Sequence, residues 1–439
     1  MSAIATVLVA MGHEVTGSDL KRSPSLDRLR SLGVEAVVGH AAENVAGADL
    51  LTISTAIPTD NVEVGEAERR GIPILRRAEI LAAITATRRT IAVAGTHGKT
   101  TTASMLALVL VEAGLRPSFI IGGDINEVGA GAVWSDGEWL VVEADESDGT
   151  FLQLTREAAV VTSIEPDHLD YYGDAAHLEQ AFAGFLAGTP AVRIACADDP
   201  TAARLGREAG ATLYGTGAGA HYRMVEVGGD RSSGWFTLVH TAAGAGATLG
   251  RVTLAVPGLH NARNACGALV AGLALGAPFD AAQRALARYG GVARRFEFRG
   301  ERDGVTYVDD YAHLPTEVAA ALSAARGGGW PRIVCVFQPH RYSRTSALWP
   351  AFADAFGEAD LVVVTDIYSA GEAPRPGVSG KLIANAILEA HPASRVQYVP
   401  GHPELVAYLR QVLRPGDLCL TLGAGDLTLL PSELLGETA

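Results

Sequence analysis

The sequence is short of cysteine and lysine, and both shortages narrow its chemistry. Its cysteines stand far apart and form no C-x-x-C pair: Cys196, Cys266, Cys335 and Cys419. They predict neither a disulfide framework nor a zinc site, and they favour a reducing, cytoplasmic setting. Only three of the 35 Lys and Arg residues are lysines, namely Lys21, Lys99 and Lys381. A reaction that needs a lysine therefore has few candidates in this chain.

Long apolar runs and an excess of positive charge are also absent. No stretch approaches the roughly 18 apolar residues of a membrane-spanning helix. Residues 3–11 are apolar, but no Lys or Arg precedes them and no small-residue cleavage pattern follows, so they predict a buried helix and no signal peptide. Asp and Glu number 49, the net charge is −14, and there is no basic tract. These features exclude membrane insertion and a general nucleic-acid binder, and they leave the oligomeric state open.

What the chain does have is length and apolar content. It has 439 residues, of which 48% are hydrophobic and 19% charged, so a disordered or fibrous protein is excluded. At about 150 residues per domain, two to four domains are expected. Composition and motif order place the boundaries at 1–88, 89–290 and 291–439.

Strand and helix signals alternate along the whole chain, which predicts α/β domains with largely parallel sheets. A Gly-rich, short-stranded stretch at 214–256 predicts an antiparallel subsheet. The expected strands are 14–19, 34–38, 50–54, 72–75, 91–94, 139–143, 159–163, 305–308, 332–337, 361–365 and 418–422. The expected helices are 25–32, 99–113 and 261–275, with two more starting near residues 316 and 346.

The sharpest motif follows the strand at 91–94 and opens a helix: Gly95, Thr96, His97, Gly98, Lys99, Thr100 and Thr101. Glycines let backbone N–H groups close around phosphate oxygens, the helix N-terminus adds positive charge, and a lysine reaches the outer phosphates. The Thr100 hydroxyl is a suitable Mg²⁺ ligand. The spacing departs from the common P-loop, because Val93 stands where that motif has glycine. A Gly-rich turn with a surface lysine is the plain alternative, and the strand–loop–helix context argues against it.

Acidic and histidine residues follow the next two strands of this domain. The run 143–148, E-A-D-E-S-D, and the run 165–170, E-P-D-H-L-D, each end a strand where Mg·ATP needs oxygen or imidazole ligands. Alone, each run could be a solvated turn. Beside a P-loop they favour a metal site that includes Glu146 and His168.

Three further motifs carry side chains suited to a nucleotide or an anionic substrate. The run 258–264, G-L-H-N-A-R-N, offers amides that could read a purine, although Asn261 could equally be a helix N-cap. The runs 308–313, V-D-D-Y-A-H, and 337–344, F-Q-P-H-R-Y-S-R, each follow a strand. Two arginines beside a histidine favour an anion pocket, with a solvated basic turn as the alternative.

In this order the motifs resemble the Mur ligase family over the whole chain, and most closely the branch that adds L-alanine. The resemblance implies a Rossmann-like UDP-binding domain, a central P-loop ATPase domain with a mixed sheet, and a Rossmann-like C-terminal domain. It implies that ATP and Mg²⁺ drive ligation of L-alanine to the muramic carboxylate of UDP-N-acetylmuramate, through an acyl phosphate, in peptidoglycan precursor synthesis.

The resemblance also carries over roles, residue by residue. Lys99 matches the phosphate-binding lysine, Thr100 and Glu146 one Mg²⁺ site, and His168 the second. Asn261 and Asn264 match adenine contacts, while Arg295, Asp309 and Asp310 match C-terminal residues that join the nucleotide site. Tyr311, His313, Arg341 and Arg344 match the region around the muramoyl group and L-alanine. Asp19, His40, Ser54 and Thr55 are what matches the UDP site. Some members hold a metal through a carbamylated lysine, but no lysine lies between Lys99 and Lys381, which agrees with the L-alanine branch.

Two departures from the family pattern stand out. His313 is followed by Leu314 where members usually have a second histidine, so either substrate affinity falls or this position serves packing. Members also begin with a strand and a G-x-G-G-x-G-M loop, whereas residues 1–5 already resemble the helix after that loop. We therefore expect the first strand to be missing from the sheet and Met1 to be a mis-assigned start, which an in-frame stop codon directly upstream would contradict.

Two other functions compete with this assignment. A ligase that reattaches a recycled tripeptide to UDP-muramate shares the P-loop, but the 337–344 motif favours the L-alanine branch. A non-catalytic UDP-muropeptide or nucleotide-binding remnant would explain the missing Gly-rich loop and Leu314. Against it, each phosphate and metal position of the central domain has a competent residue.

Overall fold

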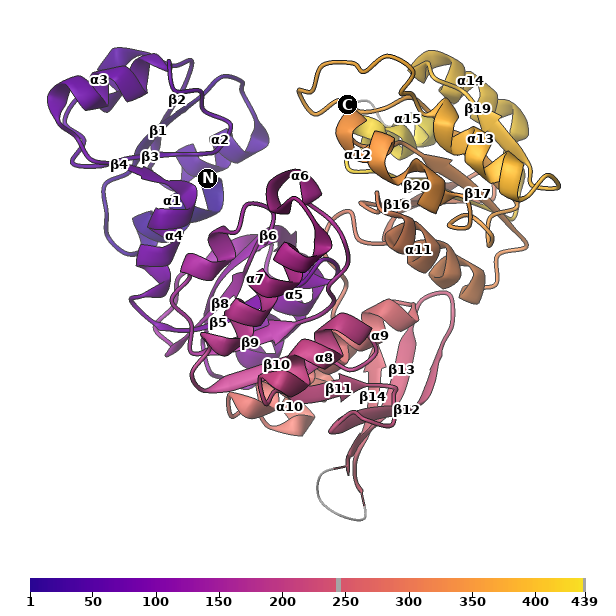
Figure 1. Ribbon diagram of the computed structural model, residues 1–439, viewed down its shortest axis with the longest axis horizontal. Coiled ribbons are helices and arrows are strands. Elements are labelled where there is room, and N and C mark those ends of the chain that lie inside the picture. The colour runs from indigo at the N-terminus through magenta and orange to yellow at the C-terminus, as the bar shows by residue number, and fades with distance from the viewer. Residues whose placement is uncertain (242–245, 437–439) are drawn as a thin grey trace. The chain divides into compact units, whose positions relative to one another are not determined.

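The computed structural model describes residues 1–241 and 246–436. The chain divides into two compact units (Figure 1). The first unit comprises Met1–Val225, Thr237–Val252 and Arg263–Arg288, and the second comprises Glu226–Phe236, Thr253–Ala262 and Tyr289–Ala439. Both are α/β structures, as the alternating signals predict. None of the described helices is long and apolar enough to cross a membrane.

The N-terminal part of the first unit contains two separate two-stranded parallel sheets, β1–β2 and β3–β4. Among the described residues, no further strand pairs with the outer edges of either sheet. The elements are α1 (Ser2–Ala10), β1 (Thr16–Asp19), α2 (Pro24–Ser31), β2 (Glu35–Val38), η1 (Ala42–Val45), β3 (Leu51–Ile53), α3 (Val62–Arg70), β4 (Ile74–Arg76) and α4 (Arg77–Thr85).

Helix α1 is buried on one face only. Ile4 and Val7 are 3% and 0% exposed and belong to the same core cluster as Ile120 and Ala132 of the central sheet. The expected buried helix is therefore confirmed. Because α1 packs against the central sheet, part of its apolar surface is removed from water.

The central sheet has ten strands in the order β14-β13-β12-β11-β10-β9-β5-β8-β6-β7. Pairing is parallel from β6 through β8, β5, β9, β10 and β11 to β12, and antiparallel between β6 and β7. The strands are β5 (Arg89–Ala94), β6 (Ser118–Ile125), β7 (Ala130–Val133), β8 (Trp139–Glu143), β9 (Ala158–Val161), β10 (Val192–Cys196), β11 (Thr212–Gly215), β12 (Tyr222–Gly229), β13 (Gly234–His240) and β14 (Ala247–Leu254).

Helices follow the parallel strands because each strand needs a crossover connection to its neighbour. Asp174 and Asp199 cap two of them by accepting hydrogen bonds from the N–H groups of His177 and Ala202. The helices are α5 (Lys99–Glu112), η2 (Thr150–Gln153), α6 (Leu169–Tyr172), α7 (Ala175–Ala187), α8 (Pro200–Glu208), α9 (Leu259–Ala274) and α10 (Phe279–Ala287).

The second unit is built on a six-stranded sheet of order β15-β16-β20-β17-β18-β19. The pairing is parallel except for β15, which runs antiparallel to β16. The strands are β15 (Glu297–Arg302), β16 (Val305–Asp310), β17 (Arg332–Phe337), β18 (Leu361–Val364), β19 (Val396–Tyr398) and β20 (Asp417–Leu422). The helices are α11 (Pro315–Gly327), α12 (Tyr342–Leu348), η4 (Trp349–Phe352), α13 (Lys381–Ala390), α14 (His402–Val412), η5 (Asp426–Leu429) and α15 (Leu430–Leu435).

Apolar cores lie on both faces of this second sheet. One cluster gathers Phe337, Phe352 and Phe356, and the other gathers Leu405, Leu409 and Leu430.

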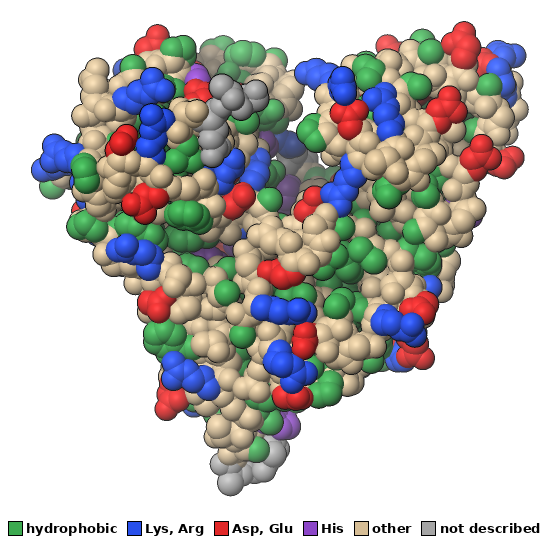
Figure 2. Space-filling model, turned by 180° about the vertical axis from the view of Figure 1, so that it is seen from behind, with side chains coloured by type: hydrophobic (Ala, Val, Ile, Leu, Met, Phe, Trp, Pro, Cys, Tyr) green, Lys and Arg blue, Asp and Glu red, His purple; other side chains and the backbone are tan. Residues whose placement is uncertain are grey.

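The prediction that a helix starts near residue 346 is wrong, because α12 already begins at Tyr342 and a 3-10 turn follows it. All four cysteines are buried free thiols. On the face shown in Figure 2, acidic and basic side chains are interspersed.

Candidate active site

The loop between β5 and α5 is shaped by two glycines with positive φ angles. Gly95 has φ 137° and Gly98 has φ 77°. A Cβ on Gly95 would overlap Thr162 Oγ1 and lie 2.9 Å from Ser163 N, while a Cβ on Gly98 would overlap Asn264 Oδ1. Both positions therefore need glycine for conformation and for space.

The loop backbone is fixed to the end of β9. Thr96 N–H donates to Ser163 O over 2.9 Å, and His97 N–H donates to Ser163 Oγ over 3.0 Å. Gly98 occupies the N-cap position of α5, and no side chain in the part of the chain that the structure describes caps this helix. The first N–H groups of a 14-residue helix thus remain free of side-chain acceptors, which suits a phosphate group.

Lys99 lies at the centre of the loop. Its Nζ donates to Gly95 O over 2.7 Å and to Glu146 Oε1 over 2.8 Å. Burial opposes the charge of Lys99, but the carboxylates of Glu146, Asp145 and Glu143 outweigh it and raise the pKa of the ammonium above its ordinary value. The lysine therefore stays a cation, as phosphate binding requires.

Two glutamates of the acidic run have different partners. Glu146 is 1% exposed, and its Oε2 is buried with no hydrogen-bond partner among the described residues. Glu143 Oε1 accepts from Thr100 Oγ1 over 2.8 Å, and its Oε2 accepts from Gly122 N–H over 2.7 Å. The predicted metal ligand Thr100 thus contacts Glu143, which the sequence offered only as one member of the run.

His168 stands beside this cluster in a left-handed backbone conformation, with φ 54°. Its Nε2 lies 3.3 Å from Asp167 Oδ2 and 3.9 Å from Glu146 Oε1. The structure therefore brings together three predicted residues, Lys99, Glu146 and His168. Within residues 1–241 and 246–436, no three His, Cys, Asp or Glu side chains form a group that could hold a metal by themselves.

The donor set nevertheless fits a divalent cation that shares its ligands with phosphate and water. An orphaned buried carboxylate oxygen on Glu146, a hydroxyl and a second carboxylate are hard oxygen ligands, and Mg²⁺ is usually held by one or two carboxylates together with substrate phosphates. A small cavity of about 10 Å³ is lined in part by Glu143 and Asp145, room for about one water molecule.

The predicted adenine residues lie near the start of α9. Asn264 faces Gly98 of the loop. Asn261 is 6% exposed, and its Nδ2 donates to Pro257 O over 2.7 Å. Because α9 begins at Leu259, Asn261 is inside the helix, so the alternative that it is an N-cap is wrong.

The residues predicted for a UDP site lie at the ends of three short strands or just after them. Asp19 ends β1 and accepts from Lys21 N–H over 3.0 Å, and Ser54 and Thr55 follow β3. His40 follows β2, and its Nδ1 lies 2.9 Å from Ser18 Oγ and 3.4 Å from Glu63 Oε2.

Glu63 was not predicted from the sequence, although it is the residue that connects this region. It is 8% exposed and accepts from Ser18 Oγ over 2.8 Å and from Asn44 Nδ2 over 2.6 Å. The sequence signal that could have found it is weak, because a glutamate in the first turn of a helix is common.

In the second unit, the two predicted aspartates at the end of β16 have structural partners. Asp309 accepts from Thr421 Oγ1 and Thr428 Oγ1, each over 2.6 Å. Asp310 accepts from the N–H groups of Phe296 and Ala312, each over 2.7 Å. Burial raises the pKa of Asp310 to about 6 despite the nearby Arg295.

Four rings form a continuous row beside these aspartates. Tyr311 meets His313 at 5.4 Å, His313 meets His340 at 5.7 Å, and His340 stacks on Tyr368 at 5.8 Å between ring centroids. The guanidinium of Arg295 lies 5.1 Å from the Tyr311 ring. The predicted residues Arg295, Tyr311 and His313 are therefore neighbours.

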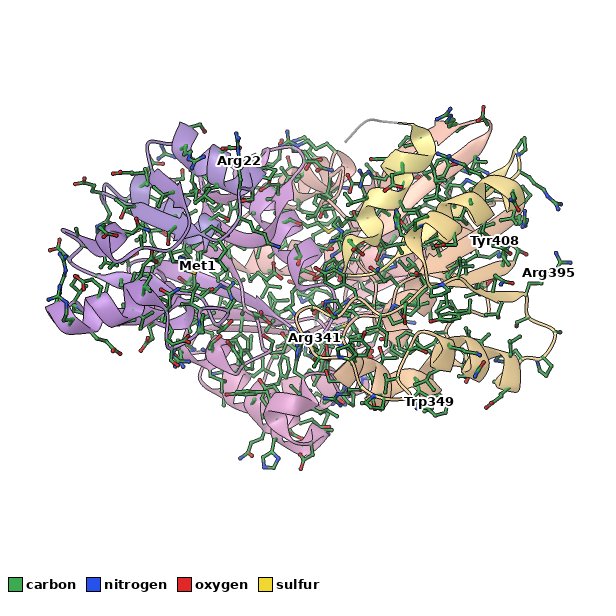
Figure 3. All side chains as sticks on the ribbon, turned by 90° about the horizontal axis from the view of Figure 1, so that it is seen from above. Met1, Arg22, Arg341, Trp349, Arg395 and Tyr408 are labelled. Atoms are coloured by element: carbon green, nitrogen blue, oxygen red, sulfur yellow. The ribbon has the colours of Figure 1, made fainter. Side chains whose placement is uncertain are left out.

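The predicted arginines of the 337–344 motif flank the same row. Arg344 Nη1 lies 2.9 Å from His340 Nδ1. Arg341, labelled in Figure 3, has φ 67°, and its Nε is buried without a hydrogen-bond partner among the described residues. Sequence reasoning missed Tyr368, which lies on the loop after β18, because a lone tyrosine in a loop carries no spacing signal.

Leu314 is 5% exposed and precedes α11, which fits the interpretation of this position as packing.

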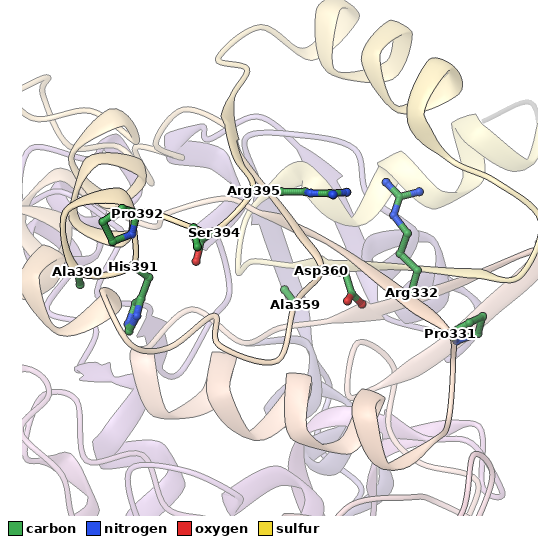
Figure 4. Close-up of a pocket in the computed structure, with 10 residues that line it drawn as sticks. Pro331, Arg332, Ala359, Asp360, Ala390, His391, Pro392, Ser394 and Arg395 are labelled. Carbon is green, nitrogen blue, oxygen red and sulfur yellow. The ribbon is translucent and has the colours of Figure 1, made fainter.

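An open hollow of about 710 Å³ lies elsewhere in the second unit, near the start of β17, β18 and β19, and contains none of the predicted residues (Figure 4). It is lined by Pro331, Arg332, Ala359, Asp360, Ala390, His391, Pro392, Ala393, Ser394 and Arg395.

Comparisons with known proteins cover the whole chain. UDP-N-acetylmuramate–L-alanine ligase of Rubrobacter xylanophilus is 48% identical over 446 aligned residues, covering 100% of this chain and 97% of that protein. The enzyme of the same name from Saccharopolyspora erythraea is 48% identical, covering 100% and 91%. The crystal structure of UDP-N-acetylmuramate-alanine ligase from Thermotoga maritima matches with a TM-score of 0.83 and 27% identity, covering 99% and 96%.

Three family descriptions match successive parts of the chain. Residues 1–89 match the Mur ligase family catalytic domain, residues 93–272 the Mur ligase middle domain, and residues 294–425 the Mur ligase glutamate ligase domain. Together with the full-length relatives, these matches show that the chain belongs to the Mur ligase family.

Proposed function

We propose that this protein joins L-alanine to the muramic carboxylate of UDP-N-acetylmuramate and converts ATP to ADP and phosphate. The observation that carries the proposal is an α5 N-terminus without a side-chain cap, at which the Lys99 ammonium is held by Gly95 O. The chain is also 48% identical to enzymes named for this reaction. The proposal places UDP-sugar binding in 1–88, ATP binding in 89–290 and ligation in 291–439.

The proposed phosphate site uses residues 95–101. Backbone N–H groups of the loop and the first turn of α5 bind the phosphate oxygens, and Lys99 neutralises the outer phosphates. Mg²⁺, when bound, would offset negative charge on the phosphates. Thr100 and Glu146 would hold one ion and His168 a second, and we add Glu143 because its carboxylate contacts the Thr100 hydroxyl.

Two steps complete the proposed reaction. A muramic carboxylate oxygen attacks the γ-phosphorus of ATP, and the bond from that phosphorus to the β–γ bridging oxygen breaks. ADP departs, and the muramic carboxylate has become an acyl phosphate. The neutral amine of L-alanine then attacks the acyl carbon, phosphate leaves, and the nitrogen loses a proton to form the amide. The protein forms no covalent bond in either step, so positioning and charge neutralisation supply the catalysis.

The remaining predicted residues are assigned to binding. We assign Asp19, His40, Ser54 and Thr55 to the UDP-sugar, and Asn261 and Asn264 to adenine. Arg295, Asp309 and Asp310 belong to the ligation domain's share of the nucleotide site. Tyr311, His313, Arg341 and Arg344 surround the muramoyl group and L-alanine, where guanidinium groups suit a carboxylate.

Phosphate release from Mg·ATP tests the proposal when UDP-N-acetylmuramate and L-alanine are added singly and together. Release should require both. Lys99→Ala should lower turnover by a factor of about 10³ or more, because a preorganised cation at a transferring phosphate is worth several kcal/mol. Lys381→Ala is the matched control, since Lys381 is exposed on α13, and it should retain wild-type turnover.

Two outcomes would replace the proposal. Release with a muropeptide tripeptide in place of L-alanine would identify a recycling ligase. Undisturbed binding of nucleotide or muropeptide without any release would identify a non-catalytic binding protein.

A further inference from the structure

The strand order at the carboxyl edge of the central sheet indicates on which side of the phosphate loop the nucleoside of the proposed nucleotide lies. Strands β5, β9, β10 and β11 are neighbours and parallel, so the loops after them lie in this order along one edge. The phosphate loop follows β5. On its other side β8 ends in the acidic run, where carboxylates repel phosphate and attract cations. The nucleoside is therefore expected on the side of β9, β10 and β11, outside the strand ends.

An ion pair without an assigned role occupies that side. Asp198 follows β10, and its side chain is 7% exposed. Its Oδ2 accepts from Arg263 Nε over 2.8 Å, and its Oδ1 accepts from the N–H groups of Thr216 and Gly217 over 2.8 Å and 3.1 Å. Burial alone would raise the pKa of Asp198, but Arg263 together with Gly217 and Thr216 holds it below its ordinary value. Asp198 thus connects α9 to the turn after β11.

Arg263 uses only one edge of its guanidinium in this pair. Its Nε is bound to Asp198, while its two Nη groups make no hydrogen bond to any residue that the structure describes. The side chain is 38% exposed, so the planar group is fixed by a buried carboxylate and is still accessible. An arginine in this state retains most of its donors and one flat face for a ligand.

The position of Arg263 along the sheet edge matches the reach of a nucleotide. Asn264, the next residue of α9, faces Gly98 of the phosphate loop, while Arg263 reaches Asp198. Strand β10 lies two strands from β5, which corresponds to about 10 Å at 4.8 Å per strand. A phosphate chain that starts in the loop therefore brings its nucleoside to Arg263.

We propose that Arg263 binds the nucleoside part of the nucleotide and that Asp198 is the residue that positions it. The proposal rests on the proposed ATP-dependent function and adds a contact to it. Arg263 offers Nη donors to ribose or base and a cationic plane on which a purine can stack. Asp198 holds that plane in one orientation, so less conformational entropy is lost on binding.

Two probes separate a nucleoside contact from a structural role. Mg·ADP carries the nucleoside, whereas inorganic triphosphate with Mg²⁺ carries only phosphates. Isothermal titration of the full chain should show that Arg263→Met weakens ADP about ten-fold and leaves triphosphate affinity within two-fold of wild type. Asp198→Asn should show the same selective loss, and smaller than that of Arg263→Met.

A matched control is Arg284→Met. Arg284 belongs to the same unit and pairs with Asp280 and Glu112 at 2.8 Å and 2.9 Å on the surface of α10 and α5. This variant should bind both probes like wild type. It shows what the loss of a surface ion pair alone does to nucleotide affinity.

The remaining outcomes are decisive. Equal loss of ADP and triphosphate in Arg263→Met would mean that the ion pair maintains the fold of the loop, and unchanged ADP affinity would mean that Arg263 lies outside the site. Either result overturns the inference while the proposed function stands. If the wild-type chain binds neither probe, the proposed function itself fails, and this inference fails with it.

Discussion

At the scale of single residues, His340 is held in one protonation state by its surroundings. Arg344 has only donors, so His340 Nδ1 must accept its hydrogen bond, and the neutral ring carries its proton on Nε2. Burial, then His313, Arg344 and Arg341, lower the pKa of His340 to about 3, and Glu372 opposes them only weakly. The ring therefore stays a neutral hydrogen-bond donor over the working pH range.

This state predicts a specific loss of stability in mild acid. Below the unfolded pKa of about 6.5 the unfolded chain takes up a proton at His340 and the folded chain does not, so stability falls as pH falls. Between pH 6.5 and 5.5 the loss attributable to this residue should be about 1 kcal/mol. Denaturant unfolding of His340→Gln at both pH values should show that the variant gains by this amount relative to wild type.

His177→Gln is the control for that series. His177 is 65% exposed, and its Nδ1 lies 2.9 Å from Asp174 Oδ1 on the surface. His177→Gln should therefore not show the gain in stability at pH 5.5, relative to wild type, that is expected of His340→Gln. Parallel curves for wild type and His340→Gln would show that His340 takes up its proton readily in the folded protein.

The same scale shows how far sequence reasoning reaches. Lys99, Glu146 and His168 were predicted from three separate motifs, and they meet because each motif ends a parallel strand beside the next. The contact of Thr100 with Glu143 could not be predicted, because a run of acidic residues does not tell which side chain faces the loop. Glu63 and Tyr368 were missed since their partners are distant in sequence.

At the scale of elements, the phosphate loop depends on glycine for two separable reasons. Gly98 and Gly114 both have positive φ, 77° and 73°, but only Gly98 has no room for a Cβ, because Asn264 fills that space. Alanine at either position should cost about 1–2 kcal/mol in backbone strain. Only Gly98→Ala should also displace Asn264 and weaken Mg·ADP binding by about ten-fold or more.

Titration with Mg·ADP and thermal unfolding of both variants measure the two effects. Similar destabilisation, with nucleotide affinity lost in Gly98→Ala alone, is the expected pattern. Unchanged affinity in Gly98→Ala would mean that Asn264 moves aside freely and that the close fit of α9 against the loop is not needed for binding.

Regular elements were predicted well where periodicity and flanking residues agree. The helix expected at 99–113 is α5, Lys99–Glu112, and the strand expected at 332–337 is β17. The start of α12 was misplaced, because the polar residues of the 337–344 motif resemble a loop although Tyr342 already begins the helix. The N-terminal strands form two separate pairs, β1–β2 and β3–β4.

The two strand pairs lead to a prediction about amide hydrogen exchange. Strands β1 and β3 are each paired along one edge only, whereas β5 lies between two parallel partners. Amide hydrogens of β1 to β4 should exchange with solvent well before those of β5, because local opening of a two-stranded sheet breaks few contacts. Hydrogen exchange followed by mass spectrometry would measure this, and equal protection would contradict the isolated pairing.

At the scale of the whole molecule, each unit has its own core. Phe182 belongs to the core of the first unit and Phe352 to one core of the second, and they are 0% and 2% exposed. Calorimetry of the full chain should therefore resolve two unfolding transitions. Phe182→Leu should lower one of them and Phe352→Leu the other, which assigns each transition to a unit. A single transition lowered alike by both variants would show that the units unfold as one.

Binding of nucleotide tests which of the two units the ligand stabilises. A ligand present at 100 times its Kd stabilises the part that binds it by about 2.7 kcal/mol. At roughly 2–4 °C per kcal/mol for units of this size, Mg·ADP should raise the transition assigned by Phe182→Leu by about 5–10 °C. Lys99→Ala should abolish this rise and Lys381→Ala should preserve it. If nucleotide instead raised only the transition assigned by Phe352→Leu, the phosphate loop would not be the principal nucleotide site, because a ligand stabilises the unit whose native contacts it needs.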